Sequence, residues 1–146
     1  MLQNPILFPK QPFAKLVADD GDIALKVRYV GSEQSATVTV SAAGDLTFKH
    51  GATGAEAVDS TVGASGVIDV TTYNTFARVV DNINGSANWE AWLVGSLRAD
   101  SSDASTGSLL ARSETTIAPK TDLSLYKDTS KVLELAVRVG IRTGVN

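Results

Sequence analysis

DIALKVRYVGSEQSATVTVSAAGDLTF, residues 22–48, alternates apolar and polar side chains in separate short runs. In the first run the apolar side chains fall on every second residue, at Ile23, Leu25, Val27 and Tyr29. In the second run Val38 and Val40 alternate with threonines, and a turn at 42–45 leads to Leu46-Thr47-Phe48. A period of two is typical of half-buried β-strands. The stretch therefore predicts a strand over 22–30 and a β-hairpin of strands 36–41 and 45–49.

Residues 67–97 predict a strand, a helix and a second strand. The helix of about twelve residues, 73–84, has apolar residues at spacings of three and four, at Tyr73, Phe76, Val80 and Ile83. Thr71 or Thr72 is a suitable N-cap, and Gly85 stands where helices commonly end. A strand at 67–70 precedes the helix. The strand that follows it, 88–97, is apolar on both faces, with Trp89 and Trp92 on opposite sides.

The remaining elements are a C-terminal strand and several loops. Leucine, valine and isoleucine alternate through 131–142, which predicts a strong amphipathic strand. Small residues and glycines predict loops at 51–66 and 98–107, and residues 109–110 and 123–126 are weaker strand candidates. The expected fold is α+β and mostly β, with one main amphipathic helix packed on a mixed or antiparallel sheet of unknown strand order. A single β-rich domain, 23–146, is expected.

Residues 1–22 predict an extended N-terminal arm. Three of the four prolines of the chain, Pro5, Pro9 and Pro12, prevent a regular helix over its first half. The apolar residues between and after them include Ile6, Leu7, Phe8 and Phe13. Such an arm packs either on its own domain or on a neighbouring subunit, and these four residues are candidate interface residues.

Composition excludes several classes of protein. The chain has 146 residues, a net charge of −3 and a pI near 5.0, and its 13 basic residues are scattered, so no direct nucleic-acid partner is expected. The absence of cysteine excludes disulfides and thiolate metal sites. No apolar run is long enough to span a membrane, and the start lacks the pattern of a signal peptide. Synthesis in a cytoplasm and no membrane partner are therefore expected.

The residue types needed for catalysis do not form a recognisable pattern. His50 is the only histidine and is expected at the surface, since an enzyme would need a pocket joining it to a buried carboxylate. Asp19, Asp20 and Asp22 lack the downstream glutamate of a calcium loop, and Asp100 and Asp103 suggest calcium no more strongly. The glycines of 51–66 do not match a phosphate-binding loop. We therefore expect no enzyme activity, no cofactor, no metal and no catalytic residue.

The aromatic residues allow two interpretations. Trp89 is expected in the core, whereas Trp92, on the opposite face of its strand, is the better candidate for an interface with another protein. Alternatively, Trp92 and Tyr73 with loop 98–107 could form a platform that stacks against a carbohydrate or recognises a receptor.

The run from Ala36 to Thr106 resembles the small virion structural proteins of tailed bacteriophages. The resemblance lies in ATVTVSAAGDLTFKHG, a Gly-rich loop, GVIDV, a helix ending in VVDNIN and the Trp-containing strand NWEAWLVGSL. It implies a protein present in many copies in the virion, first as a capsid decoration or cement protein and alternatively as a neck, tail or baseplate component. The implied partners are other copies of the chain, with a homotrimer as one fitting form, and a major capsid or other virion protein. The resemblance implies no site residues.

Overall fold

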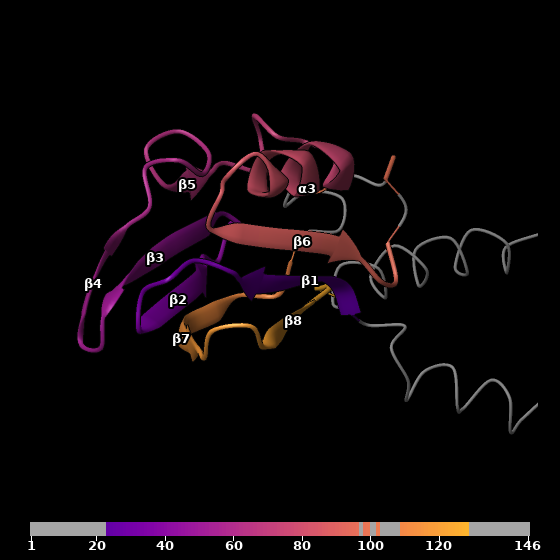
Figure 1. Ribbon diagram of the computed structural model, residues 1–146. Helices are drawn as coiled ribbons and strands as arrows, with labels where there is room; N and C mark the ends of the chain where they lie inside the picture. Colours follow the sequence, from indigo (N-terminus) through magenta and orange to yellow (C-terminus); the bar gives the residue numbers. More distant parts are fainter. Residues whose placement is uncertain (1–22, 97, 100–101, 103–108, 129–146) are drawn as a thin grey trace, which may run out of the picture.

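A computed structural model describes residues 23–96, 98–99, 102 and 109–128 of the chain (Figure 1). The expected arm at 1–22, the expected strand at 131–142 and most of the expected loop at 98–107 lie outside these residues. The candidate interface residues Ile6, Leu7, Phe8 and Phe13 therefore also lie outside them.

The described strands form two antiparallel sheets. The first has three strands in the order β6-β1-β8, which are Trp89–Leu93, Ile23–Tyr29 and Asp122–Tyr126. The second has the order β4-β3-β2-β7, with β5 also beside β3. Its strands are β2 (Ser35–Val40), β3 (Leu46–Ala52), β4 (Ala55–Val58), β5 (Val67–Ile68) and β7 (Arg112–Ile117). The expected class, mostly β with one main helix, is confirmed.

The inward faces of the two sheets share one core. Val27 and Tyr29 contribute from β1 and Val38 and Phe48 from the other sheet, all fully buried. Trp89 of β6 joins the two layers, because its ring meets Phe48 edge-on at 4.8 Å and Tyr29 at 5.1 Å between ring centroids. The alternation seen in the sequence thus places one side of each strand in the core.

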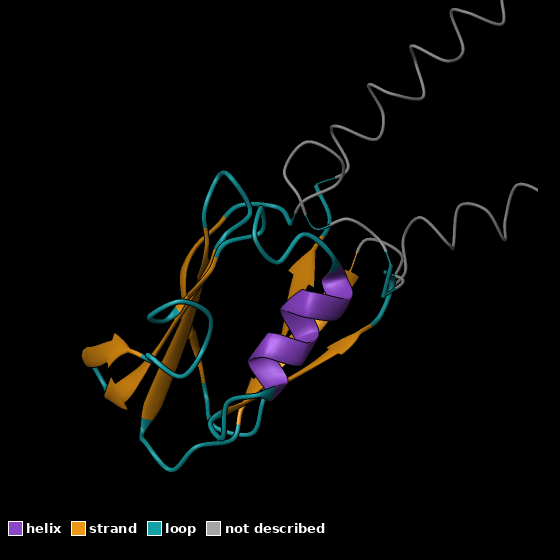
Figure 2. Cartoon of the chain, turned by 90° about the horizontal axis from the view of Figure 1, so that it is seen from above, coloured by secondary structure: helices purple, strands orange, loops and turns teal. Residues whose placement is uncertain are grey.

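The helix α3 spans Phe76–Asn84 and covers the opening between the sheets on the side of β6 (Figure 2). Its inward face is buried through Phe76, Val79, Val80 and Ile83. It ends at Gly85 as predicted, but it begins three residues after the expected Tyr73, with Thr75 as the N-cap. The expected caps, Thr71 and Thr72, instead donate their hydroxyls to Asp69 in the turn before the helix.

Three other expectations differ from the structure. Residues 51–66 were expected as a loop, but they include the end of β3 and all of β4, which pairs with β3 from Ala52↔Ala55 to Lys49↔Val58. The polar strand β7 was not expected, because five of its six residues are not buried and no apolar alternation marks it. The strands either side of α3 belong to different sheets, so the expected strand–helix–strand unit connects the two layers.

Both ends of the described domain lie at one corner of the three-stranded sheet. Ile23, at the start of β1, is paired with Tyr126, at the end of β8. Lys127 is the last described residue with a strand contact, in an isolated bridge to Leu109. The start of β1 and the end of β8 therefore lie side by side (Figure 1).

Candidate functional site

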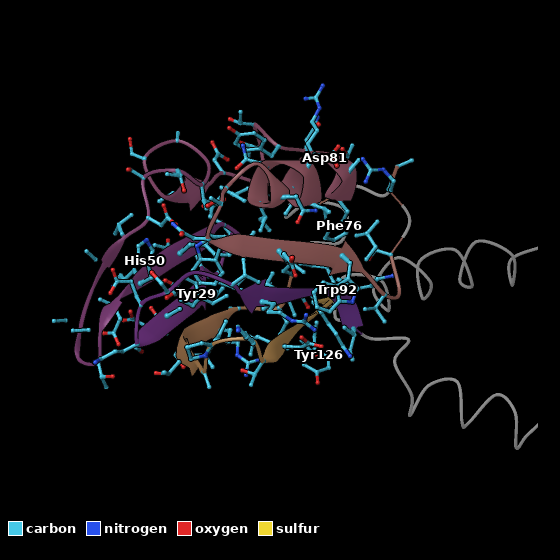
Figure 3. All side chains as sticks on the ribbon, viewed as in Figure 1. Tyr29, His50, Phe76, Asp81, Trp92 and Tyr126 are labelled. Atoms are coloured by element: carbon cyan, nitrogen blue, oxygen red, sulfur yellow. The ribbon has the colours of Figure 1, made fainter. Side chains whose placement is uncertain are left out.

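The outward side of the three-stranded sheet carries Tyr126, the one exposed aromatic residue among the described residues, and the half-buried Trp92. We call it the Trp92 face, and it consists of Lys26, Arg28, Glu90, Trp92, Val94, Asp122, Ser124 and Tyr126. Trp92 is half-buried and projects from the opposite side of β6 to the buried Trp89 and Ala91. Tyr126 is 41% exposed and Val94 is 37% exposed. Trp92 and Tyr126 lie toward the corner where β1 begins and β8 ends (Figure 3).

Arg28 is held over Trp92 by carboxylates on both neighbouring strands. Its Nε and Nη2 each lie 2.7 Å from Oδ1 of Asp122, and its Nη1 lies 3.9 Å from Oε2 of Glu90. Its guanidinium carbon is 5.2 Å from the centroid of the Trp92 ring, within the range of a cation–π interaction. The centre of the Trp92 face is therefore an aromatic ring with a positioned arginine. Tryptophan, tyrosine and arginine are the residues most enriched at binding hot spots between proteins.

The outward side of the five-stranded sheet has a different chemistry. Thr37 donates a hydrogen bond of 2.8 Å to Oε1 of Glu114, and Nζ of Lys49 lies 3.0 Å from the same oxygen. The hydrogen bonds from Thr37 and Lys49, with the positive charge of Lys49, lower the pKa of Glu114 below its ordinary value. The polar groups of these side chains are thus already paired with one another. The Trp92 face differs from this surface because its charged side chains surround a half-buried aromatic ring.

His50 is not the simple surface histidine that the sequence suggested. It is paired with the buried Ala36 across β2 and β3, and so projects toward the core, where its ring stacks on Tyr29 at 5.6 Å. Its Nε2 lies 3.3 Å from Oδ2 of Asp59, whose side chain is only 2% exposed. Nδ2 of Asn88 lies 3.4 Å from the same Nε2, so the histidine tautomer decides whether Nε2 donates to Asp59 or accepts from Asn88. A histidine and a buried carboxylate thus do meet, although no sequence spacing indicated it.

Asp59 is saturated with hydrogen bonds from several directions. The backbone N–H and hydroxyl of Thr61 donate to Oδ1 at 2.9 and 2.6 Å. Nδ2 of Asn88 and Nε1 of Trp89 donate to Oδ2, each at 3.0 Å. Burial raises the pKa of Asp59, but the hydrogen bonds from Thr61, Asn88 and Trp89 lower it by more than burial raises it. The pKa of Asp59 therefore lies below its ordinary value. The Asp59 carboxylate therefore stabilises the fold by connecting the turns at this end of the core.

Tyr73 and Trp92, the two residues considered for a carbohydrate-binding platform, do not share a site in the structure. Tyr73 lines an open hollow of about 420 Å³ beside α3, together with Thr72, Arg78, Asp81 and Asn82. Trp92 projects from β6 beside Arg28 and does not line this hollow. The aspartates at 19, 20, 22, 100 and 103 lie outside the described residues. Among the residues that are described, no group of three histidine or acidic side chains could hold a metal ion.

The sequence identified Trp92 as an interface candidate but did not single out Arg28 or Tyr126. Tyr126 was placed only in the weaker strand candidate at 123–126. The closeness of these residues depends on the register, in which Arg28 lies opposite both Glu90 and Asp122. An arginine that lies opposite one acidic residue on each neighbouring strand becomes recognisable only after the strand order is known.

No family model, curated protein or solved structure matches this chain. None of the helices in the described part is long and apolar enough to cross a membrane.

Proposed function

We propose that this chain is a non-enzymatic structural protein of a tailed-phage virion, a capsid decoration or cement protein that stabilises the particle through protein–protein contacts. It is made in the host cytoplasm and functions in the virion, in contact with other copies of itself and a major capsid protein. The observation that carries the proposal is the Trp92 face, an exposed aromatic and arginine surface on a domain whose core is formed elsewhere.

The physical reason is the location of Trp92 relative to the core. Trp89 and Ala91 on the inner side of β6 are buried within the domain, so Trp92 on the outer side is not needed to join the two sheets. A large aromatic ring left partly in water gains free energy when a partner covers it, on the order of 25 cal/mol per Å² of apolar surface. Arg28 is already fixed by Asp122, so little side-chain entropy is lost on contact. Such a surface favours binding to a protein over chemistry on a small molecule.

The proposal is tested in purified virions of the phage that encodes the chain. We expect the chain to be present in many copies and antibody labelling to decorate the capsid. Labelling of the neck or tail alone would replace the decoration role with the tail, neck or baseplate alternative. Absence of the chain from the virion would refute both.

A matched pair of variants connects the proposal to the Trp92 face. Trp92→Ser should reduce incorporation into particles at least tenfold, because it removes the centre of the face. Val58→Ser changes an apolar residue that is 47% exposed on the other sheet, and should be incorporated like the wild type. Equal incorporation of the two variants would show that the face does not contact the particle.

The second candidate function is binding to a carbohydrate or receptor. It is favoured by the hollow beside α3, where Tyr73 offers an aromatic ring beside polar side chains of Arg78 and Asp81. Asp81 also holds Arg98, with Oδ2 2.6 Å from Nη2. A glycan array separates the two functions, since a specific glycan signal lost in Tyr73→Ala would favour the second one.

A further inference from the structure

We propose that Asn84-Gly85 is a site of spontaneous deamidation that the folded domain keeps unreactive, so that opening of the end of α3 leads to a permanent chemical change in Asn84. Deamidation converts the amide of an asparagine to a carboxylate without an enzyme. The inference does not depend on the proposed function, because it concerns the covalent chemistry of the chain itself. It rests on the sequence at Asn84 and on the contacts of Asn84 and Gly85.

The reaction needs only the asparagine, the next backbone nitrogen and water. The nitrogen of Gly85 loses its proton and attacks Cγ of Asn84, a C–N bond forms, and the side-chain nitrogen takes up that proton and leaves as ammonia. Water then opens the resulting five-membered succinimide at either carbonyl, which gives aspartate or isoaspartate. Glycine has no Cβ to shield the attacking nitrogen, and Asn84 is the one asparagine in the chain that glycine follows.

In the folded domain a residue of β6 holds both ends of the Asn84 amide. Its Nδ2 donates to the carbonyl of Ala91 at 2.9 Å, and its Oδ1 accepts from the N–H of Ala91 at 2.7 Å. Attack by Gly85 requires both hydrogen bonds, the Asn84–Ala91 contact, to break. Asn84 is exposed, so water reaches it. The geometry of the side chain, and not a lack of water, therefore prevents the reaction.

The attacking nitrogen is held as well. The N–H of Gly85 donates to the carbonyls of Asp81 at 3.0 Å and Asn82 at 3.2 Å, at the last turn of α3. These hydrogen bonds retain the proton that the nitrogen has to lose. Side chains in a helix also point back toward its N-terminus, away from the nitrogen of the next residue. Ring closure therefore requires Asn84 to leave its helical conformation, which opens the last turn of α3.

The product cannot restore the Asn84–Ala91 contact. An aspartate at this position can accept from the N–H of Ala91, but it leaves the carbonyl of Ala91 without its donor. In an isoaspartate the main chain runs through the former side chain, which moves the free carboxylate. The new negative charge also lies at the C-terminal end of α3, where the helix dipole disfavours it. One opening thus leaves the free edge of β6 permanently less covered.

Two protection ratios measured on the full-length chain test the inference. Mass spectrometry gives the deamidation rate of Asn84 in concentrated urea divided by the rate in the folded chain. Hydrogen exchange gives the same ratio for the N–H of Ala91. The deamidation ratio should equal or exceed the exchange ratio, because attack needs the opening that frees Ala91 and, in addition, the release of Gly85. In urea Asn84 should react faster than Asn82, which isoleucine follows.

Two variants separate the reaction from its consequence. In urea, Gly85→Ala should slow deamidation at least about tenfold, equivalent to a barrier about 1.4 kcal/mol higher, because its methyl group shields the nitrogen. Asn84→Asp is a stable form of one product. In the folded chain it should accelerate exchange of the Ala91 N–H at least about fivefold, since a carbonyl that has lost its donor weakens the contact.

Three outcomes would overturn the inference. A deamidation ratio below the exchange ratio would show that Asn84 reacts while its contact with Ala91 is closed. Equal rates for Asn84 and Asn82 in urea, or no effect of Gly85→Ala, would show that the glycine does not make the site reactive. Exchange at Ala91 that is unchanged in Asn84→Asp would show that the product keeps the contact. None of these results changes whether the chain is found in virions, so the proposed function is tested separately.

Discussion

Asp59 is the residue on which one end of the core depends, because a single buried carboxylate receives hydrogen bonds from Thr61, Asn88 and Trp89. Asp59→Asn keeps the size of the side chain but replaces one accepting oxygen with a donating NH₂ group. At least one buried donor then loses its acceptor, which costs about 1–3 kcal/mol. Urea unfolding at neutral pH should show a loss of this size, with an unchanged dependence on urea concentration.

The chain contains a matched control for this substitution. Asp69 accepts from the backbone N–H and hydroxyl of Thr71 at 2.8 and 2.6 Å, which repeats the local geometry of Asp59 and Thr61. Asp69 is more exposed, so water can replace what Asp69→Asn loses. The loss of stability should therefore be clearly smaller than in Asp59→Asn. Equal losses would mean that the local turn, and not burial, makes Asp59 important.

Asp59 also predicts how stability depends on pH. Because its pKa is lower in the folded chain than in the unfolded one, the unfolded chain takes up a proton first as the pH falls. The stabilisation is complete above the ordinary pKa of 3.8 and is lost as the pH falls through the lower pKa of the folded state. Urea midpoints measured from pH 7 to about pH 3 should fall below about pH 4, and less steeply in Asp59→Asn. An equal slope in the variant would assign the acid sensitivity to other carboxylates, such as Glu114.

The sequence could predict little of the contacts around Asp59. Trp89 was expected in the core on the pattern of its strand, and this is confirmed by its 1% exposure. The meeting of His50 with Asp59 was not expected, because it needs β4 to return the chain beside β3. The β4 sequence AEAV is short, and three of its four residues are exposed, so it carries no apolar alternation. The one available signal was the repeated Asp-X-Thr turn at 59–61 and 69–71.

At the scale of elements, α3 closes the edge of β6 through a side chain at its last residue. The amide of Asn84 makes the two hydrogen bonds to Ala91 that a neighbouring strand would otherwise make. Asn84→Ala should lower the free energy of unfolding by about 1–3 kcal/mol, since both backbone groups lose their partner. Amide hydrogen exchange should accelerate most at Ala91. Uniform acceleration along α3 and β6 would show instead that the helix as a whole had been destabilised.

The ends of helices and strands were predictable where a nearby residue alone determines them. Gly85 ends α3 as expected, and the hairpin turn at 42–45 connects β2 and β3. The start of α3 was wrong because Thr71 and Thr72 are suitable caps by type but are used by Asp69. The polar strand β7 was missed because its place depends on β2, which supplies its hydrogen bonds. Pairing partners of this kind are not encoded in the local pattern.

For the whole molecule, the division into two sheets was also beyond the sequence pattern. The strands were identified, but alternation gives only the two sides of each strand and not its neighbours. Trp92 was correctly separated from Trp89, yet its environment of Arg28 and Tyr126 follows from the order β6-β1-β8.

The N-terminal arm gives a prediction at this scale. Deleting residues 1–17 should leave the domain folded, because the described core is formed by residues from Ile23 onward. The truncated chain should keep a cooperative melting transition and show weaker incorporation into particles. Loss of that transition would place the arm in the core and contradict the proposal that it contacts neighbouring subunits.

Because Ile23 pairs with Tyr126, the two ends of the described domain could be joined and the chain opened at another turn. Paired residues on neighbouring strands lie about 5 Å apart, so a few glycines could join Asp128 directly to Ile23. New ends could then be opened at Thr53-Gly54, in the turn between β3 and β4, where a Cβ on Gly54 would meet open space. Such a circular permutant would carry every strand and α3 of the described domain without either terminal segment. A protein fused to these new ends would then project from the end of the domain opposite to Ile23 and Tyr126 (Figure 1).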